Sequence, residues 1–173
     1  MRGLVQVLGG QGRVEEALKL LAGMSESERR KVGGVSRLRA EAALQRAKLA
    51  EQRGDREALR TELEAALREE PDNAWANFAL ARSYVDLGRV DEARRLMTDL
   101  LKRAPNDVDA LYTSALLAVQ LDDLAQARSL LARIAPNQRT AEIESLESEL
   151  AFNDELQRIE RVIKNGQRRD ARI

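Results

Sequence analysis

The sequence predicts an all-α protein, a solenoid of stacked helix–turn–helix units, from two observations. Charged residues make up 34% of the 173 residues and aromatic residues only 3%. Strong helix formers (alanine, leucine, glutamate and arginine) dominate the chain. A ten-residue pattern also occurs twice, as GRVEEALKLL at 12–21 and as GRVDEARRLM at 88–97. Internal similarity of this kind is typical of repeat proteins, whose units stack on their neighbours.

A period of 34 residues runs through the middle of the chain. Gly54 and Gly88 are 34 residues apart, and so are Pro71 and Pro105. The period and its helix–turn–helix content resemble tetratricopeptide repeats. The best copy is 74–107, in which five residues stand at the positions that the repeat prescribes: Leu80, Ala81, Tyr84, Ala93 and Met97. The resemblance implies a right-handed superhelix of helical hairpins, in which Ala81 and Ala93 lie at helix–helix contacts.

The repeats divide the chain into seven expected segments. They are a partial repeat 1–23, a connector 24–39, repeats 40–73, 74–107 and 108–139, an extra helix 140–152 and a partial repeat 153–173. The connector is polar and is predicted to hold one short helix from Ser25. In the flanking repeats Arg46 and Ser114 replace the expected leucine, and Asp122 replaces the turn glycine. Because both ends cut through a repeat, we expect a fragment of a longer solenoid.

A hinge or bend is predicted over 135–153, where the period fails. Pro136 comes three residues early, Thr140 is the expected N-cap of the extra helix, and Asn153 follows that helix. The alternative is that the extra helix packs tightly and fixes a single angle. Its apolar residues at helical spacing are Ile143, Leu146 and Leu150.

The composition argues against an enzyme. The chain has no histidine and no cysteine, which removes the common nucleophile pairs, the thiolate and imidazole metal sites and the usual general base. Adjacent acids such as Asp91 and Glu92 point about 100° apart on a helix and do not converge. The glycine-rich stretch 8–12 lacks the lysine and hydroxyl of a phosphate loop. We therefore expect no catalytic residue, no metal and no cofactor.

Charge and hydropathy narrow the range of partners. The 29 basic and 29 acidic residues give a formal net charge of zero, so no general affinity for nucleic acid or anionic membranes is expected. The longest apolar run, 115–119, is far too short to cross a bilayer. A basic tail at Arg168, Arg169 and Arg172 is most simply a solvated helix end.

Recognition by an exposed surface remains as the expected function. In tetratricopeptide arrays the first helix of each repeat lines the concave face, so the resemblance assigns a partner-binding surface to these helices. The candidate residues are Lys48, Trp75, Phe78, Arg82 and Tyr112. Three of the five aromatic residues thus fall on one predicted face, beside an arginine, a composition typical of binding surfaces. The alternative is that the aromatic side chains simply pack against the preceding repeat.

A narrower resemblance lies in two stretches. The run LLARI at 130–134, followed after an inserted Ala135 by PNQR at 136–139, precedes the extra helix. The stretch EEPDNAWANFALARSYVDLGR occupies 69–89. Both resemble the N-terminal tetratricopeptide region of the cellulose synthase operon protein C family.

This resemblance implies a periplasmic scaffold of a polysaccharide secretion complex. The parent protein would continue into an outer-membrane β-barrel, and the repeats would link that export pore to the inner-membrane synthase. The implied ligands are protein partners of the complex, with the glucan chain as an alternative ligand; alginate or poly-N-acetylglucosamine systems stay open as relatives. The alternative is an unrelated cytoplasmic tetratricopeptide adaptor that binds a peptide.

Overall fold

Helices are the only regular secondary structure in the part of the chain that the structure, a computed structural model, describes. That part is the backbone of residues 1–170, with the side chains of all these residues except Arg2 and 165–170. Two compact units, Met1–Pro105 and Asn106–Ile173, make up the chain. The all-α fold predicted from the sequence is confirmed.

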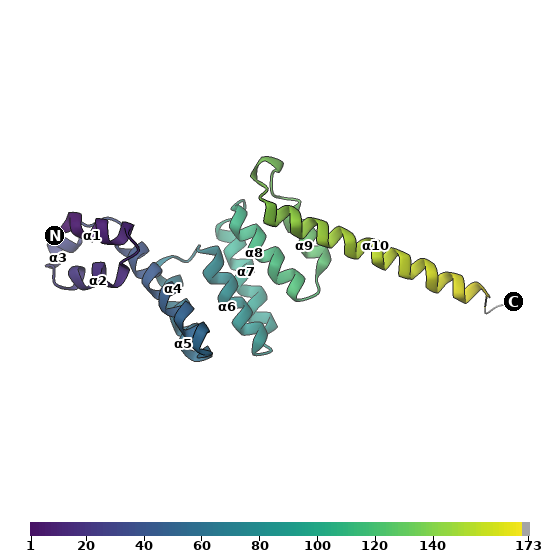
Figure 1. Ribbon diagram of the computed structural model, residues 1–173, viewed down its shortest axis with the longest axis horizontal. Helices are drawn as coiled ribbons and strands as arrows, with labels where there is room; N and C mark the ends of the chain where they lie inside the picture. Colours follow the sequence, from purple (N-terminus) through teal and green to yellow (C-terminus); the bar gives the residue numbers. More distant parts are fainter. Residues whose placement is uncertain (171–173) are drawn as a thin grey trace. The chain divides into compact units, whose positions relative to one another are not determined.

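The first unit is a series of helical hairpins (Figure 1). Its helices are α1 (Arg2–Gly10), α2 (Val14–Ala22), α3 (Glu26–Arg29), α4 (Val35–Arg53), α5 (Arg56–Glu69), α6 (Ala74–Asp86) and α7 (Val90–Arg103). The hairpins are α1–α2, α4–α5 and α6–α7, and consecutive hairpins contact each other through α2 with α4 and through α5 with α6. Ala81 and Ala93 have no exposed surface within the α6–α7 hairpin. Small side chains therefore let these two helices approach closely, as predicted.

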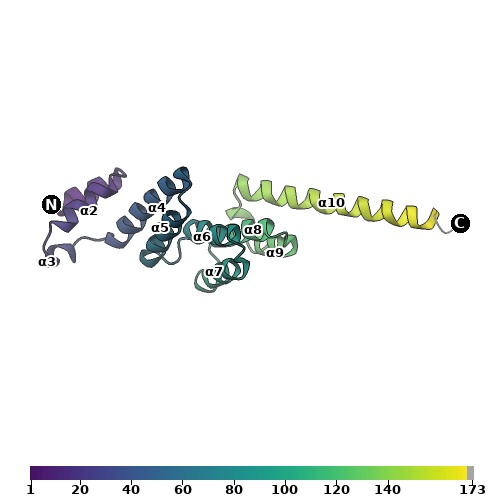
Figure 2. The ribbon, with the colours of Figure 1, turned by 90° about the horizontal axis from the view of Figure 1, so that it is seen from below.

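The second unit contains one hairpin and one long helix, which Figure 2 shows from a second direction. Its elements are α8 (Val108–Gln120), α9 (Leu124–Leu131), the 3-10 helix η1 (Pro136–Gln138) and α10 (Ala141–Asp170). Helix α9 packs on α8 and on α10. At eight residues α9 is shorter than α5 or α7, with fourteen each, which explains why Pro136 comes early.

Helix α10 departs from the predicted division at this end of the chain. The sequence predicted an extra helix 140–152 and a separate partial repeat from 153, but α10 continues through Asn153 without interruption. No proline or glycine lies between Ala141 and Gly166, so nothing in this stretch ends a helix. The predicted basic tail at Arg168, Arg169 and Arg172 lies outside the side chains that the structure describes.

One turn recurs in all four hairpins. Gly12, Gly54 and Gly88 have φ angles of 73°, 71° and 73°, and Asp122 has a φ of 58° at the equivalent place. In the α6–α7 turn the Arg89 N–H donates to the Tyr84 carbonyl at 2.8 Å, and in the α8–α9 turn the Asp123 N–H donates to the Ala118 carbonyl at 2.8 Å. This is the left-handed cap that ends many helices. Asp122 therefore adopts a backbone conformation that suits glycine.

The repeated decapeptide builds the same local structure twice. Arg13 Nε donates to Glu16 Oε1 at 2.8 Å, and Arg89 Nε donates to Glu92 Oε1 at 3.0 Å. These arginines stand at N-cap positions that have no side-chain cap. At the start of five other helices a short side chain accepts a hydrogen bond from the N–H three residues further on; these caps are Ser25, Asp55, Asn73, Asp107 and Asp123.

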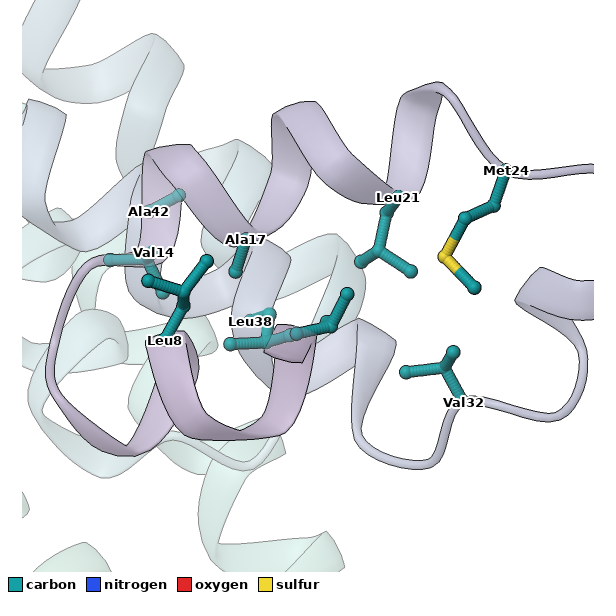
Figure 3. Close-up of a cluster of buried hydrophobic side chains, with 9 residues drawn as sticks. Leu8, Val14, Ala17, Leu21, Met24, Val32, Leu38 and Ala42 are labelled. Carbon is teal, nitrogen blue, oxygen red and sulfur yellow. The ribbon is translucent and has the colours of Figure 1, made fainter. Parts of the chain in front are cut away.

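The predicted connector 24–39 contributes to the core. The short helix from Ser25 is present as α3 and carries a capping box with Glu28. Met24 and Val32, on either side of α3, are buried in the apolar cluster shown in Figure 3. Helix α4 begins at Val35, inside the predicted connector, because Leu38 joins the same cluster. The short connector is thus a packed link between α2 and α4.

Candidate binding groove

A groove in the first unit lies between α4 and α6, with α5 at its base. Its volume is about 330 Å³. Twelve residues line it: Leu44, Ala47, Lys48, Glu51, Leu59, Leu63, Trp75, Ala76, Ala79, Arg82, Ser83 and Asp86. We call it the α4–α6 groove.

The floor of the α4–α6 groove is apolar. Ala47, Leu63 and Ala76 belong to a buried cluster, with Leu44 and Leu59 partly buried against it. The alanine side chains leave room between larger neighbours, so the hollow follows from the small residues that the repeat places here.

The rim of the α4–α6 groove carries balanced charge. Lys48 and Glu51 come from α4, and Arg82 and Asp86 come from α6. No salt bridge of the described residues involves any of these four side chains. Two cations and two anions are therefore available at one opening, with no net charge.

An aromatic pair lies at one side of the groove. Trp75 is 52% exposed, and its ring meets the Phe78 ring edge-to-face, with centroids 6.3 Å apart and planes at 78°. The Arg82 guanidinium carbon lies 5.8 Å from the Phe78 centroid. Phe78 is half-buried and does not line the groove. The Phe78 ring instead contacts the Trp75 indole and the Arg82 guanidinium, which both line the groove.

The structure brings together three of the five predicted binding residues. Lys48, Trp75 and Arg82 line the α4–α6 groove, and Phe78 stands directly behind the last two. Tyr112 lies on α8 in the other unit, half-buried. Burial and the nearby negative charge of Glu142 raise the pKa of Tyr112 above its ordinary 10.0.

The three predicted hinge residues fall in different settings. Pro136 begins η1, Thr140 immediately precedes α10, and Asn153 lies inside α10. The apolar residues of α10 that the sequence singled out are all buried: Ile143, Leu146 and Leu150. Such packing is what the fixed-angle alternative expects, and the hinge stays a prediction.

Two polar residues with structural roles were missed in the sequence. Arg46 reaches Glu15 of α2 at 2.7 Å and Glu62 of α5 at 2.9 Å, so it joins neighbouring hairpins. Asn77 is buried, and its amide donates to the carbonyls of Pro71 and Asn73, both at 2.9 Å. The available signal was the departure from the repeat pattern, because Arg46 replaces leucine and Asn77 replaces tryptophan.

No group of three or more acidic side chains that could hold a metal occurs among the described residues. In the same part of the chain no helix combines the length and apolarity needed to cross a membrane. The arrangement offers stacking, hydrogen bonding and apolar contact, which are means of recognition.

The hairpins with their recurring turn and the groove between first helices define a class of helical repeat protein. A tetratricopeptide repeat model matches residues 52–107 and 91–150, and the chain belongs to that family. The chain is 41% identical, over 171 residues and 99% of its length, to cellulose synthase operon protein C of Pseudomonas fluorescens (strain SBW25). The narrower resemblance found in the sequence is thereby confirmed.

Two further relatives carry the same name. The protein of Xanthomonas axonopodis pv. citri (strain 306) is 39% identical over 140 residues, which cover 81% of this chain. That of Salmonella typhimurium (strain LT2) is 27% identical over 163 residues, which cover 91%. The chain spans only 13%, 9% and 13% of the length of these three relatives, respectively.

Proposed function

We propose that the chain is a non-enzymatic scaffold segment of a cellulose or related exopolysaccharide secretion complex. It acts in the periplasm, where it holds protein partners between an inner-membrane synthase and an outer-membrane export pore. The observation that carries this proposal is the 41% identity over 99% of the chain to cellulose synthase operon protein C.

The packing within each unit suits a scaffold. Salt bridges tie neighbouring segments of the first unit, such as Arg46 with Glu15 and Arg103 with Asp72 at 2.7 Å each. In the second unit Arg139 pairs with Glu147 of α10 at 2.8 Å. Stacked repeats joined in this way hold their exposed surfaces at fixed spacing along the unit.

A segment replacement tests this function. In a cellulose-producing Pseudomonas fluorescens, the matching segment of cellulose synthase operon protein C is replaced by this chain, and extracellular cellulose is measured by dye binding. We expect export close to that of the parent strain. The matched control carries an unrelated tetratricopeptide array of equal length at the same place, which we expect to lose export.

Two results would contradict the scaffold function. One is a replacement protein that accumulates normally while no cellulose is exported. The other is equal export with the unrelated array, because the segment would then be only a spacer.

A further inference from the structure

We propose that the α4–α6 groove binds a neutral glucan chain, with one sugar ring stacked on Trp75. The proposal rests on the proposed function, because a scaffold in a cellulose export complex works beside such a chain. It goes further by naming the ligand class and the residues that hold it.

Trp75 provides a stacking platform. Its indole is 52% exposed at the groove and is held from behind by the edge-to-face contact with Phe78. The C–H faces of a glucose ring are apolar and can lie flat on such a ring, which loses little freedom on binding because Phe78 already fixes it.

The rim provides hydrogen bonds for hydroxyl groups. Lys48 and Arg82 are hydrogen-bond donors, and Glu51 and Asp86 are acceptors. None of these four side chains forms a salt bridge within the described residues. The Ser83 hydroxyl donates to the Leu80 carbonyl at 2.8 Å, which leaves its oxygen free to accept. Charged groups form stronger hydrogen bonds than neutral ones, so a hydroxyl-rich ligand suits this rim.

Charge balance selects a neutral polymer. Two cations and two anions around one opening give an acidic polysaccharide no net attraction, since each carboxylate that meets Lys48 or Arg82 also approaches Glu51 or Asp86. A glucan carries no charge and meets no such repulsion.

The small volume of the α4–α6 groove favours a glucan over a peptide. Grooves that hold a peptide usually receive one large apolar anchor in a deep pocket. Here the apolar lining is made of three alanines and three leucines, and the volume of about 330 Å³ is small. It offers room for a short, flat stretch of chain beside the exposed indole.

The test uses the intrinsic fluorescence of Trp75, the single tryptophan of the chain. The whole chain is titrated with cellohexaose. We expect a saturable change in the intensity or wavelength of the fluorescence, with a dissociation constant on the order of 1 mM or below.

Lys48→Ala and Arg82→Ala should each weaken binding by about fivefold or more, because each removes a charged hydrogen-bond donor. Arg95→Ala, an exposed arginine of α7 outside the groove, should leave the affinity unchanged.

Isothermal titration calorimetry measures binding of cellohexaose without relying on the fluorescence of Trp75. Trp75→Ala should abolish the heat of cellohexaose binding. Phe152→Ala, which removes an exposed aromatic ring from α10, should leave this heat unchanged. Circular dichroism confirms that both variants are folded.

Three outcomes would overturn the inference. One is the absence of saturable binding, and another is equal binding of a hexamer of uronic acids. The third is the selection, from a displayed peptide library, of peptides that change the fluorescence of Trp75 when cellohexaose does not change it. The groove would then be a peptide site. If cellohexaose fails while the replaced segment still exports cellulose, the glucan site falls and the scaffold function stands.

Discussion

Asp122 holds a turn position that glycine occupies in the three other hairpins of the described chain. Its φ of 58° lies in the left-handed region, where a side chain costs about 1–2 kcal/mol. Asp122→Gly should therefore stabilise the protein by about 1 kcal/mol, and Gly88→Ala, at a φ of 73°, should destabilise it by a similar amount. A Cβ at Gly88 would meet nothing within 4 Å, so only backbone strain enters the comparison.

Urea denaturation of the two variants and the parent measures these changes. Equal stability of all three proteins would mean that the turn relaxes to accept a side chain.

Ser114 is a buried polar residue at a leucine position of the repeat. Its hydroxyl has no hydrogen-bond partner within the described residues. Ser114→Ala should raise the free energy of unfolding by about 1 kcal/mol, because it removes an unsatisfied buried group. The neighbouring Thr113 is equally buried, but its hydroxyl donates to the Asp109 carbonyl at 2.7 Å, so Thr113→Val should be neutral or destabilising. A thermal melt in which Ser114→Ala loses stability would indicate a partner for the hydroxyl.

At this scale the sequence shows where the repeat pattern fails but not what each failure does. Arg46, Ser114 and Asp122 are all visible as departures from the pattern. Arg46 gains two carboxylate partners, Ser114 gains none, and Asp122 takes on backbone strain. These outcomes depend on side chains far away in sequence, such as Glu15, which the period alone does not bring into contact.

Helix α10 is continuous across the place where the sequence predicted a break. The chain has no native cysteine, so spin labels at Glu144→Cys and Arg161→Cys report on this helix alone. A straight helix rises 1.5 Å per residue, which predicts a single narrow distance of about 26 Å between the labelled backbones. A shorter or broad distribution would indicate a break near Asn153.

The break predicted after residue 152 followed from the sequence pattern, but the helix does not follow that pattern. The repeat pattern predicted a new unit after residue 152. The apolar residues before and after this point also lie on different faces of the helix, so they do not form one continuous apolar stripe. Ile143, Leu146 and Leu150 face the core, whereas Phe152, Leu156 and Ile159 are exposed. Helix length is set here by local propensity, not by the repeat.

Tyr112 on α8 and Glu142 on α10 give a titration that reports on packing within the second unit. The pKa of Tyr112 is raised by burial and by the Glu142 charge, so its hydroxyl should stay protonated above pH 10.0. The folded chain then holds this proton more tightly than the unfolded chain. The resulting stability is present below pH 10.0 and is lost as the pH rises through the folded pKa.

Tyr84→Phe leaves Tyr112 as the single tyrosine, whose ionisation is followed by absorbance. The midpoint should lie above pH 10.0, and adding Glu142→Gln should lower it, whereas Glu144→Gln should not. No difference between the two glutamate variants would place the Glu142 charge away from the ring.

At the scale of the whole molecule, the hinge predicted at Pro136 and Thr140 can be tested directly. Spin labels at Ser83 and Gln157 lie on either side of it, and the hinge predicts a broad distance distribution. The pair within α10 is the control, because a narrow distance there excludes bending of α10 as the cause. A narrow distribution between Ser83 and Gln157 would leave only a static bend.

The candidate site was predictable in part at this scale. The register of the repeat located Lys48, Trp75 and Arg82, since equivalent positions on successive first helices face the same groove. The balance of charge at the rim and the support of Trp75 by Phe78 required the structure, because both depend on how α4, α5 and α6 pack.

The recurring turn also makes the repeats interchangeable. Gly54, Gly88 and Asp122 follow one another at intervals of 34 residues and share one backbone conformation. Deletion of residues 55–88 would join Gly54 to Arg89 and recreate the same left-handed junction before a helix. Unequal recombination between repeats therefore yields a chain whose junction is already a working turn. An array of this design can lengthen or shorten by whole units as its gene evolves.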